Sequence, residues 1–241
     1  MQNDKIDLSL IIPIGLMLFS FFFGAGNLIF PPVLGQMAGE NIGWGMLGFC
    51  LSGVGFPLLG VLAMAMKQSD NPDSIAMPMH PLYARAVTIL CALAIGPLFA
   101  IPRTAAVSFD TGIHSLLPAS CEAIGLPVYT VFFFVLTYFF SINPSKIIGH
   151  IGKFLSPMLL ICLAVLVVCV FVNPTGSLKM PNPDFAASPF FRGFQEGYNT
   201  MDLLAAILFG SITIKAIEAQ GITDKKVLTK LCSYAGLIAA F

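Results

Sequence analysis

Long apolar stretches separated by short polar connections set the strongest limit on how this chain can fold. A helix that crosses the roughly 30 Å hydrocarbon core of a bilayer needs about 20 predominantly apolar residues. Six segments meet or approach that length, and a seventh begins late in the sequence. The predicted spans are residues 8–36, 43–66, 84–112, 127–142, 146–172, 190–215 and 226–241. We therefore predict an all-α polytopic membrane protein, with residues 1–241 in a single transmembrane domain.

The low charge content agrees with a surface that faces a lipid bilayer. Charged residues make up 10% of the 241 residues, whereas soluble domains use about 25%. The net charge is zero, so we expect no nucleic-acid partner. Neither a nucleophile–base constellation nor a phosphate loop is present, which argues against an enzyme or an ATP-driven pump. We expect no cofactor and no transition-metal site, since no histidine has a metal ligand four residues after it.

The distribution of lysine and arginine predicts the orientation in the membrane. If the N-terminus is cytoplasmic, nine of these residues lie on the cytoplasmic side and only two on the other. The nine are Lys5, Lys67, Arg85, Lys146, Lys153, Lys215, Lys225, Lys226 and Lys230, and the two are Lys179 and Arg192. Cytoplasmic loops are enriched in positive charge. We therefore expect a cytoplasmic N-terminus.

The first segment has an unusual centre. Gly24, Gly26 and Asn27 lie near its midpoint, where good helix formers are expected. A helix break in the membrane must line a protein cavity, because lipid cannot satisfy free backbone groups. The ends at such a break offer carbonyl groups to a cation and N–H groups to a carboxylate. Alternatively, the two glycines simply let a neighbouring helix approach closely. The adjacent asparagine favours a break.

The sixth segment contains a second irregular stretch. Residues 195–202 are too polar for a lipid-facing helix, and Gly197 and Asn199 resemble the pattern in the first segment. Paired irregular segments in an inverted repeat point to a transporter's binding site. An alternative is that residues 190–202 form a loop and the span begins after it. We favour a second break.

A charged residue, Arg103, lies inside the third segment. A buried arginine in a membrane is costly, so it should face the bundle interior and a counter-charge, for which Glu196 and Asp202 are the candidates. The alternative is that its side chain reaches outward to the interface. Pro97 and Pro102 predict a kink in this helix. We assign charge pairing or gating to Arg103, Glu196 and Asp202.

Three motifs together resemble the bacterial branched-chain amino acid:cation symporter family (LIVCS). They are Phe22-Phe-Gly-Ala-Gly-Asn-Leu-Ile-Phe-Pro-Pro32, Gly96-Pro-Leu-Phe-Ala-Ile-Pro-Arg-Thr-Ala105 and Gly197-Tyr-Asn-Thr-Met-Asp202. The resemblance extends over essentially the whole chain. It implies a secondary active transporter that takes up leucine, isoleucine and valine through the inner membrane by alternating access, coupled to Na⁺ or H⁺.

The first motif is also similar to the broken first helix of sodium-coupled carriers with a five-helix inverted repeat, the LeuT-like transporter fold. This similarity implies that residues 8–172 form the first repeat and residues 190–241 the start of the second. It also implies that the carbonyl groups of Ser20 and Phe23 bind the cation. The substrate-binding residues implied by the similarity are Phe22, Gly24, Ala25, Gly26, Asn27, Tyr198, Asn199 and Thr200.

The sequence departs from this family in length. Family members are nearly twice as long, and in the wider fold an eighth helix completes the cation site. We therefore expect a truncated chain. A membrane fragment that does not transport, and a carrier of another small amino acid or amphipathic solute, stay open as alternatives. A channel is disfavoured because no ring-forming filter motif is present.

Overall fold

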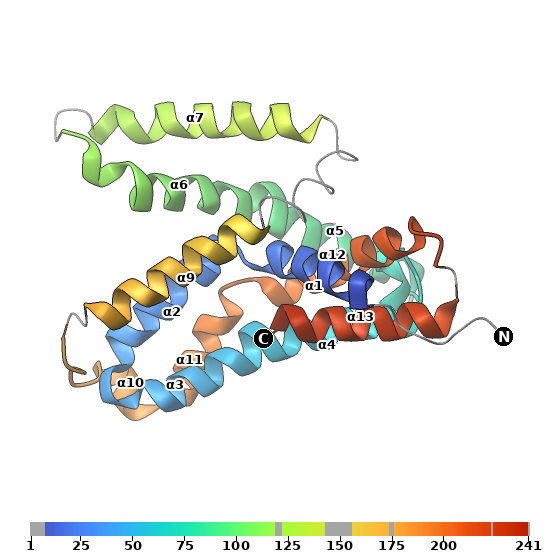
Figure 1. The fold of residues 1–241 in the computed structure, drawn as a ribbon, viewed down its shortest axis with the longest axis horizontal. Helices are drawn as coiled ribbons and strands as arrows, with labels where there is room; N and C mark the ends of the chain where they lie inside the picture. Colours follow the sequence, from blue (N-terminus) through green and yellow to red (C-terminus); the bar gives the residue numbers. More distant parts are fainter. Residues whose placement is uncertain (1–7, 119–121, 143–155, 174–175, 223, 241) are drawn as a thin grey trace.

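The computed structural model describes residues 8–118, 122–142, 156–173, 176–222 and 224–240, and all regular structure in these residues is helical (Figure 1). The predicted all-α class is therefore confirmed. The helices up to residue 116 are α1 (Leu8–Phe22), α2 (Ala25–Ala38), η1 (Gly39–Asn41), α3 (Ile42–Cys50), η2 (Leu51–Gly55), α4 (Phe56–Lys67), η3 (Pro72–Ile75), α5 (Pro81–Leu93), η4 (Ala94–Leu98), α6 (Ala100–Gly112) and η5 (His114–Leu116). The later helices are α7 (Glu122–Ser141), α9 (Ser156–Val172), α10 (Pro183–Ala187), α11 (Pro189–Tyr198), α12 (Asp202–Glu218) and α13 (Lys225–Ala240).

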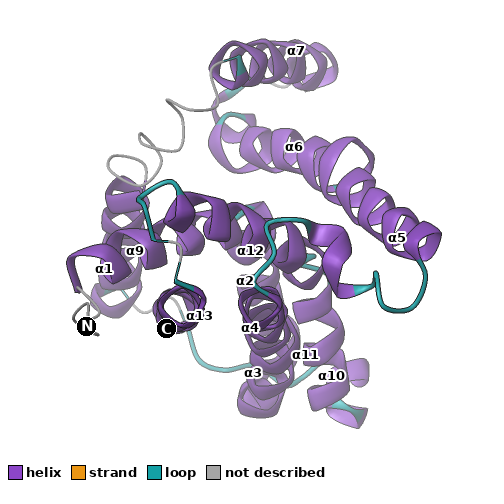
Figure 2. Cartoon of the chain, turned by 90° about the vertical axis from the view of Figure 1, so that its right-hand side faces the viewer, coloured by secondary structure: helices purple, strands orange, loops and turns teal. Residues whose placement is uncertain are grey.

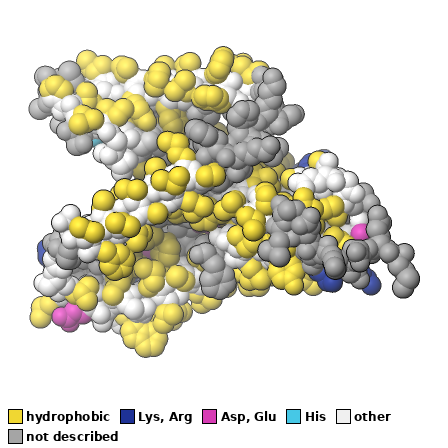
Figure 3. Space-filling view, in the orientation of Figure 1, with side chains coloured by type: hydrophobic (Ala, Val, Ile, Leu, Met, Phe, Trp, Pro, Cys, Tyr) yellow, Lys and Arg dark blue, Asp and Glu magenta, His cyan; other side chains and the backbone are white. Residues whose placement is uncertain are grey.

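Several of these helices have the length and composition of membrane spans. Three described stretches qualify, namely Ala25–Lys67, Pro81–Gly112 and Ile124–Ser141, and a fourth forms if α11 and α12 are counted as one bent span. The helices α1 and α9 are apolar but shorter. Residues 146–155 of the predicted fifth span lie outside the described residues. Hydrophobic side chains cover much of the outer face of the molecule (Figure 3), as expected for helices in contact with lipid.

The stretch Ala25–Lys67 turns back on itself at η1. Gly39 there has φ +49°, and an added Cβ would lie 2.0 Å from the carbonyl oxygen of Lys179. Glycine is required because only it combines this backbone conformation with so close an approach. After the turn, Gly45 of α3 comes close to Leu34 of α2, so the two helices are in contact near the turn. This stretch thus contains the end of the first predicted span and the whole of the second.

The main core joins four helices from both ends of the chain. Ile14 of α1, Met64 of α4, Ile214 of α12 and Leu231 of α13 belong to one buried cluster. A second cluster links α2, α3 and α10 through Leu34, Ala38, Phe49 and Phe185. The helices α5, α6 and α7 lie to one side of these clusters (Figure 2). The main core therefore contains residues of both interrupted spans, the first through α1 and the sixth through α12.

The third predicted span is kinked at Pro97, as its sequence predicts. A π-helical turn, η4, separates α5 from α6, and Gly96 within it has non-helical angles of φ −78° and ψ −115°. Proline cannot donate a backbone hydrogen bond, which releases a carbonyl one turn earlier. Pro102 lies in the first turn of α6 without a further break, because N–H groups in a first turn have no partner inside the helix.

Candidate functional site

The first predicted span is interrupted at Phe23 and Gly24, and this confirms the predicted break. The N–H of Phe23 still donates to the carbonyl of Phe19 at 2.8 Å, as the last turn of α1. Gly24 is extended, with φ −116° and ψ −169°, and α2 begins at Ala25. The break therefore places the carbonyl end of one helix beside the N–H end of the next.

The sixth predicted span has a second interruption, between Tyr198 and Asp202. The helices α11 and α12 meet there at 43°. Met201 adopts a left-handed φ of +67°, a conformation that costs a residue with a Cβ about 1–2 kcal/mol. The hydroxyl of Thr200 donates to the carbonyl of Gly197 at 2.7 Å and so satisfies one group at the end of α11. The alternative of a loop followed by a helix is wrong, because residues 189–198 are helical.

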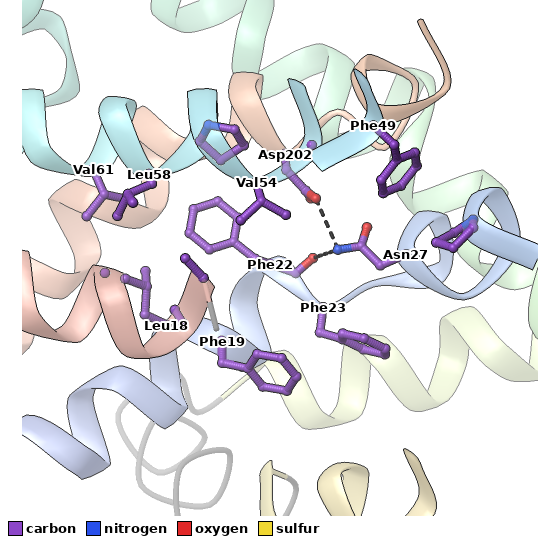
Figure 4. Close-up of a pocket in the computed structure, with 16 residues that line it drawn as sticks. Leu18, Phe19, Phe22, Phe23, Asn27, Phe49, Val54, Leu58, Val61 and Asp202 are labelled. Carbon is purple, nitrogen blue, oxygen red and sulfur yellow. Dashed lines mark hydrogen bonds between the residues drawn. The ribbon is translucent and has the colours of Figure 1, made fainter. Parts of the chain in front are cut away.

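One side chain, that of Asn27, connects the two breaks. Its Nδ2 donates to the carbonyl of Phe22 at 3.1 Å and to Oδ2 of Asp202 at 3.1 Å (Figure 4). The first bond satisfies a carbonyl at the end of α1, and the second reaches the first residue of α12. Both groups are costly to leave unpaired away from water. The two interruptions therefore form one polar site.

Arg103 of α6 holds the carbonyl end of the second break. Its Nη1 donates to the carbonyl of Asn199 at 2.8 Å and its Nη2 to that of Thr200 at 3.2 Å. The guanidinium also lies 5.4 Å from the ring centroid of Phe30. A cation at the C-terminal end of a helix is favoured by the helix dipole. Arg103 thus faces the interior, as predicted, but it binds backbone oxygens.

The two carboxylates proposed as counter-charges for Arg103 are occupied differently. Oε2 of Glu196 accepts a hydrogen bond of 3.4 Å from the side chain of Asn199. Asp202 accepts a hydrogen bond from Asn27 and interacts electrostatically with Arg103 without a direct ion pair. In the described part of the chain, the ion pairs join Arg192 to Asp184 and Lys215 to Asp70. Neither of these pairs lies in the breaks.

The two glycines of the first break have different environments. An added Cβ on Gly26 would lie 3.1 Å from Nη2 of Arg103 and 3.2 Å from the Cα of Thr200. An added Cβ on Gly24 would find its nearest atom, the carbonyl oxygen of Phe22, at 4.0 Å. The alternative explanation, that a glycine lets a neighbouring helix approach closely, therefore holds for Gly26. It holds there together with the break. Gly26 brings the first break against the second.

A cavity of about 240 Å³ opens beside the two breaks. Asn27 and Asp202 form its polar end, while Leu18, Leu58 and Val61 lie at the other end, with Phe22 between them (Figure 4). Pockets for drug-sized ligands occupy roughly 300–1,000 Å³, so this one suits a smaller solute. An amphipathic cavity of this kind fits a molecule with one polar and one apolar end.

The structure brings only some of the predicted site residues into this cavity. Its lining includes Phe22, Phe23, Asn27 and Asp202. The remaining predicted residues, none of them among the described residues that line the cavity, are Ser20, Gly24, Ala25, Gly26, Arg103, Glu196, Tyr198, Asn199 and Thr200. Most of these residues belong to the two breaks beside the cavity. The side chain of Tyr198 is 47% exposed.

Sequence reasoning missed the apolar wall of the cavity. Leu58 and Val61 of α4 contribute to it, as do Gly236 and Ala239 of α13. These residues look like any others in an apolar helix, and their role depends on how α4 and α13 pack. Only the glycines on these helices give a sequence signal, because small residues at helical spacing mark the places where membrane helices pack closely.

The helical architecture, the apolar outer surface and the interrupted spans around an amphipathic cavity are those of a multi-pass membrane protein. The profile of the family described as "Branched-chain amino acid transport protein" matches residues 8–241. The chain therefore belongs to this family, as its motifs predict.

Curated relatives agree with this assignment. The branched-chain amino acid permease BrnQ of Bacillus subtilis is 45% identical over 239 residues, which cover 99% of this chain and 54% of the relative. The branched-chain amino acid transport system 3 carrier protein of Pseudomonas aeruginosa is 39% identical, covering 95% of this chain and 52% of the relative. The chain thus spans about half the length of the curated relatives it matches. No solved structure matches it.

Proposed function

We propose that this chain forms the substrate-binding part of a secondary active transporter that takes up leucine, isoleucine and valine across the inner membrane. The observation that carries the proposal is the Asn27–Asp202 hydrogen bond, which joins two interrupted spans at one end of an amphipathic cavity. The names of its relatives, branched-chain amino acid permeases and carriers, support the substrate class. Such a carrier is not an enzyme and uses no cofactor.

The same proposal extends to the fold and its orientation. Residues 8–172 would form the first five-helix repeat of a LeuT-like inverted-repeat transporter, and residues 190–241 the start of the second. Two interrupted spans, the first and the sixth, support this arrangement, because an odd-numbered repeat inverts its topology. The excess of lysine and arginine on one side supports a cytoplasmic N-terminus.

Each part of an amino acid has a complement in or beside the cavity. The first N–H groups of α2, near Gly24 and Ala25, suit the carboxylate because helix N-termini favour anions. The branched side chain would pack against Leu58 and Val61, which stabilises by roughly 1.5–3 kcal/mol when it is fully buried. The carbonyl end of α1, around Ser20 and Phe23, suits a coupling Na⁺ or a proton carrier. Alternating access would expose this site to each side in turn.

The proposal is tested by uptake of labelled leucine into proteoliposomes containing the 241-residue chain. We expect uptake when either a sodium or a proton gradient is imposed, and loss of accumulation when neither is present. Leucine uptake that is independent of both gradients would reject cation coupling. A complete lack of uptake together with a lack of leucine binding would reject the carrier proposal in favour of a fragment that does not transport.

Two glycine variants test whether leucine uptake depends on the first break. Gly26→Leu would drive a side chain into Arg103 and Thr200, so we expect leucine uptake to fall by about tenfold or more, since overpacking costs about 1–3 kcal/mol. Gly43→Leu is the matched control, because an added Cβ there meets no atom within 4 Å. Wild-type uptake by Gly26→Leu would remove the first break from the site.

A further inference from the structure

A buried carboxylate, that of Asp202, lies at the polar end of the cavity. Asp202 is 7% exposed and begins α12 directly after the second break. Aspartate is almost never fully buried without a partner of opposite charge. Its burial beside a cavity therefore needs an explanation that the hydrogen bond to Asn27 alone does not give.

Asp202 interacts electrostatically with Arg103 but forms no direct ion pair with it. Its carboxylate accepts a hydrogen bond from the amide of Asn27, which is neutral. Arg103 is the cation at this break, and its terminal nitrogens donate to the carbonyls of Asn199 and Thr200. No ion pair reaches Asp202 from any residue that the structure describes. The position is therefore suited to a cationic group that comes from outside the protein.

The shape of the cavity restricts what that cationic group can be attached to. Beyond Asp202 and Asn27 the lining becomes aliphatic and aromatic, with Phe22, Leu58 and Val61 facing the space (Figure 4). A bare metal ion would leave these apolar side chains without a partner. A ligand with an ammonium head and a branched apolar tail would match both ends.

We propose that Asp202 binds the ammonium group of the substrate, with the amide of Asn27 fixing the direction of its carboxylate. The proposal rests on the transport of branched-chain amino acids proposed above and adds a residue that determines specificity. Asp202 would make the site select compounds with a free amino group over the corresponding deaminated acids. A carboxylate would also repel those acids, which lack the ammonium and keep the negative charge.

Three compounds with the same branched apolar tail separate the contributions of the two charged groups. Leucine has both charged groups, 4-methylpentanoate lacks the ammonium, and 3-methylbutylamine lacks the carboxylate. Calorimetric titration of each into the purified 241-residue chain measures its affinity separately. For the unaltered chain we expect leucine to bind about tenfold or more tightly than 4-methylpentanoate, the ratio that corresponds to about 1.4 kcal/mol. We also expect measurable binding of 3-methylbutylamine.

The variant Asp202→Asn keeps the size of the side chain and removes its charge. We expect it to weaken the binding of leucine and 3-methylbutylamine and to strengthen the binding of 4-methylpentanoate. The ratio of the affinities for leucine and 4-methylpentanoate should then fall to about one. Asp202→Glu, which keeps the charge, should restore the preference. Asp110→Asn is the control, because this carboxylate on α6 is exposed and lies outside the cavity lining.

The possible outcomes are distinguishable. A parallel loss of all three affinities in Asp202→Asn would make Asp202 a structural residue, and an unchanged preference would also overturn the proposal. If Asp202→Asn does not fold, the unaltered chain still decides, because binding of 4-methylpentanoate without binding of 3-methylbutylamine contradicts an ammonium site. If the unaltered chain binds no leucine at all, the proposed function itself fails.

Discussion

At the scale of single residues, Asn27 has the most demanding position in the chain. It is an amide between two helix breaks, and its Nδ2 serves a backbone carbonyl on one side and a carboxylate on the other. An aliphatic residue there would leave both acceptors without this donor. Buried acceptors that lose their donor cost about 1–3 kcal/mol each. Asn27 therefore stabilises the interrupted backbone as well as the cavity.

A double-mutant cycle between Asn27 and Asp202 tests this connection. We expect Asn27→Ala and Asp202→Ala each to lower the free energy of unfolding in detergent, and the double variant to lose less than the sum. Directly bonded residues show coupling energies of about 0.5–3 kcal/mol. Additive losses would show that the hydrogen bond contributes nothing, and Asn41→Ala, which removes the amide that bonds to the Phe185 carbonyl, serves as the control partner for Asp202→Ala.

At the scale of elements, the packing of α3 on α11 positions the second break. An added Cβ on Gly193 would lie 1.9 Å from the carbonyl oxygen of Gly45, and one on Gly48 would lie 2.0 Å from that of Phe190. The hydroxyl of Ser52 crosses the same interface to the carbonyl of Phe194 at 2.6 Å. Small residues let membrane helices approach closely and pack their backbones. This contact holds the end of α11 beside the cavity.

A single methyl group in this interface should be destabilising. We expect Gly193→Ala to lower the melting temperature in detergent through overpacking, which costs about 1–3 kcal/mol. Gly43→Ala, an open position at the start of α3, should leave it unchanged or raise it, because alanine is the better helix former. Equal melting temperatures for the two variants would mean that α3 and α11 do not meet as closely as described.

The sequence predicts the elements better than it predicts their partners. Gly24 with Asn27 indicates the first break, and Pro97 the kink in the third span, because each changes the backbone locally. The hydrogen bonds of Arg103 to two carbonyls could not be predicted, since a charge-based argument points to carboxylates. They depend on the close approach of α6 to the second break, which is a property of the tertiary fold.

At the scale of the whole molecule, the sequence predicts the class but not the arrangement. The length of the apolar stretches and the low charge content are sufficient to predict an all-α membrane protein. The cluster that joins α1, α4, α12 and α13 brings residues from both ends of the chain together, and no local pattern encodes that. The aliphatic wall of the cavity was missed for the same reason. The orientation and the repeat stay predictions.

The proposed function requires that the cavity beside the two breaks binds a branched-chain amino acid. Photo-leucine, a leucine analogue with a light-activated diazirine in its side chain, tests it most directly through mass spectrometric mapping of the labelled residues. If the cavity holds the substrate, adducts form at Phe22, Leu58 and Val61, and excess leucine suppresses them. Adducts spread over the outer faces of α7 and α9, unaffected by leucine, would contradict the proposed function.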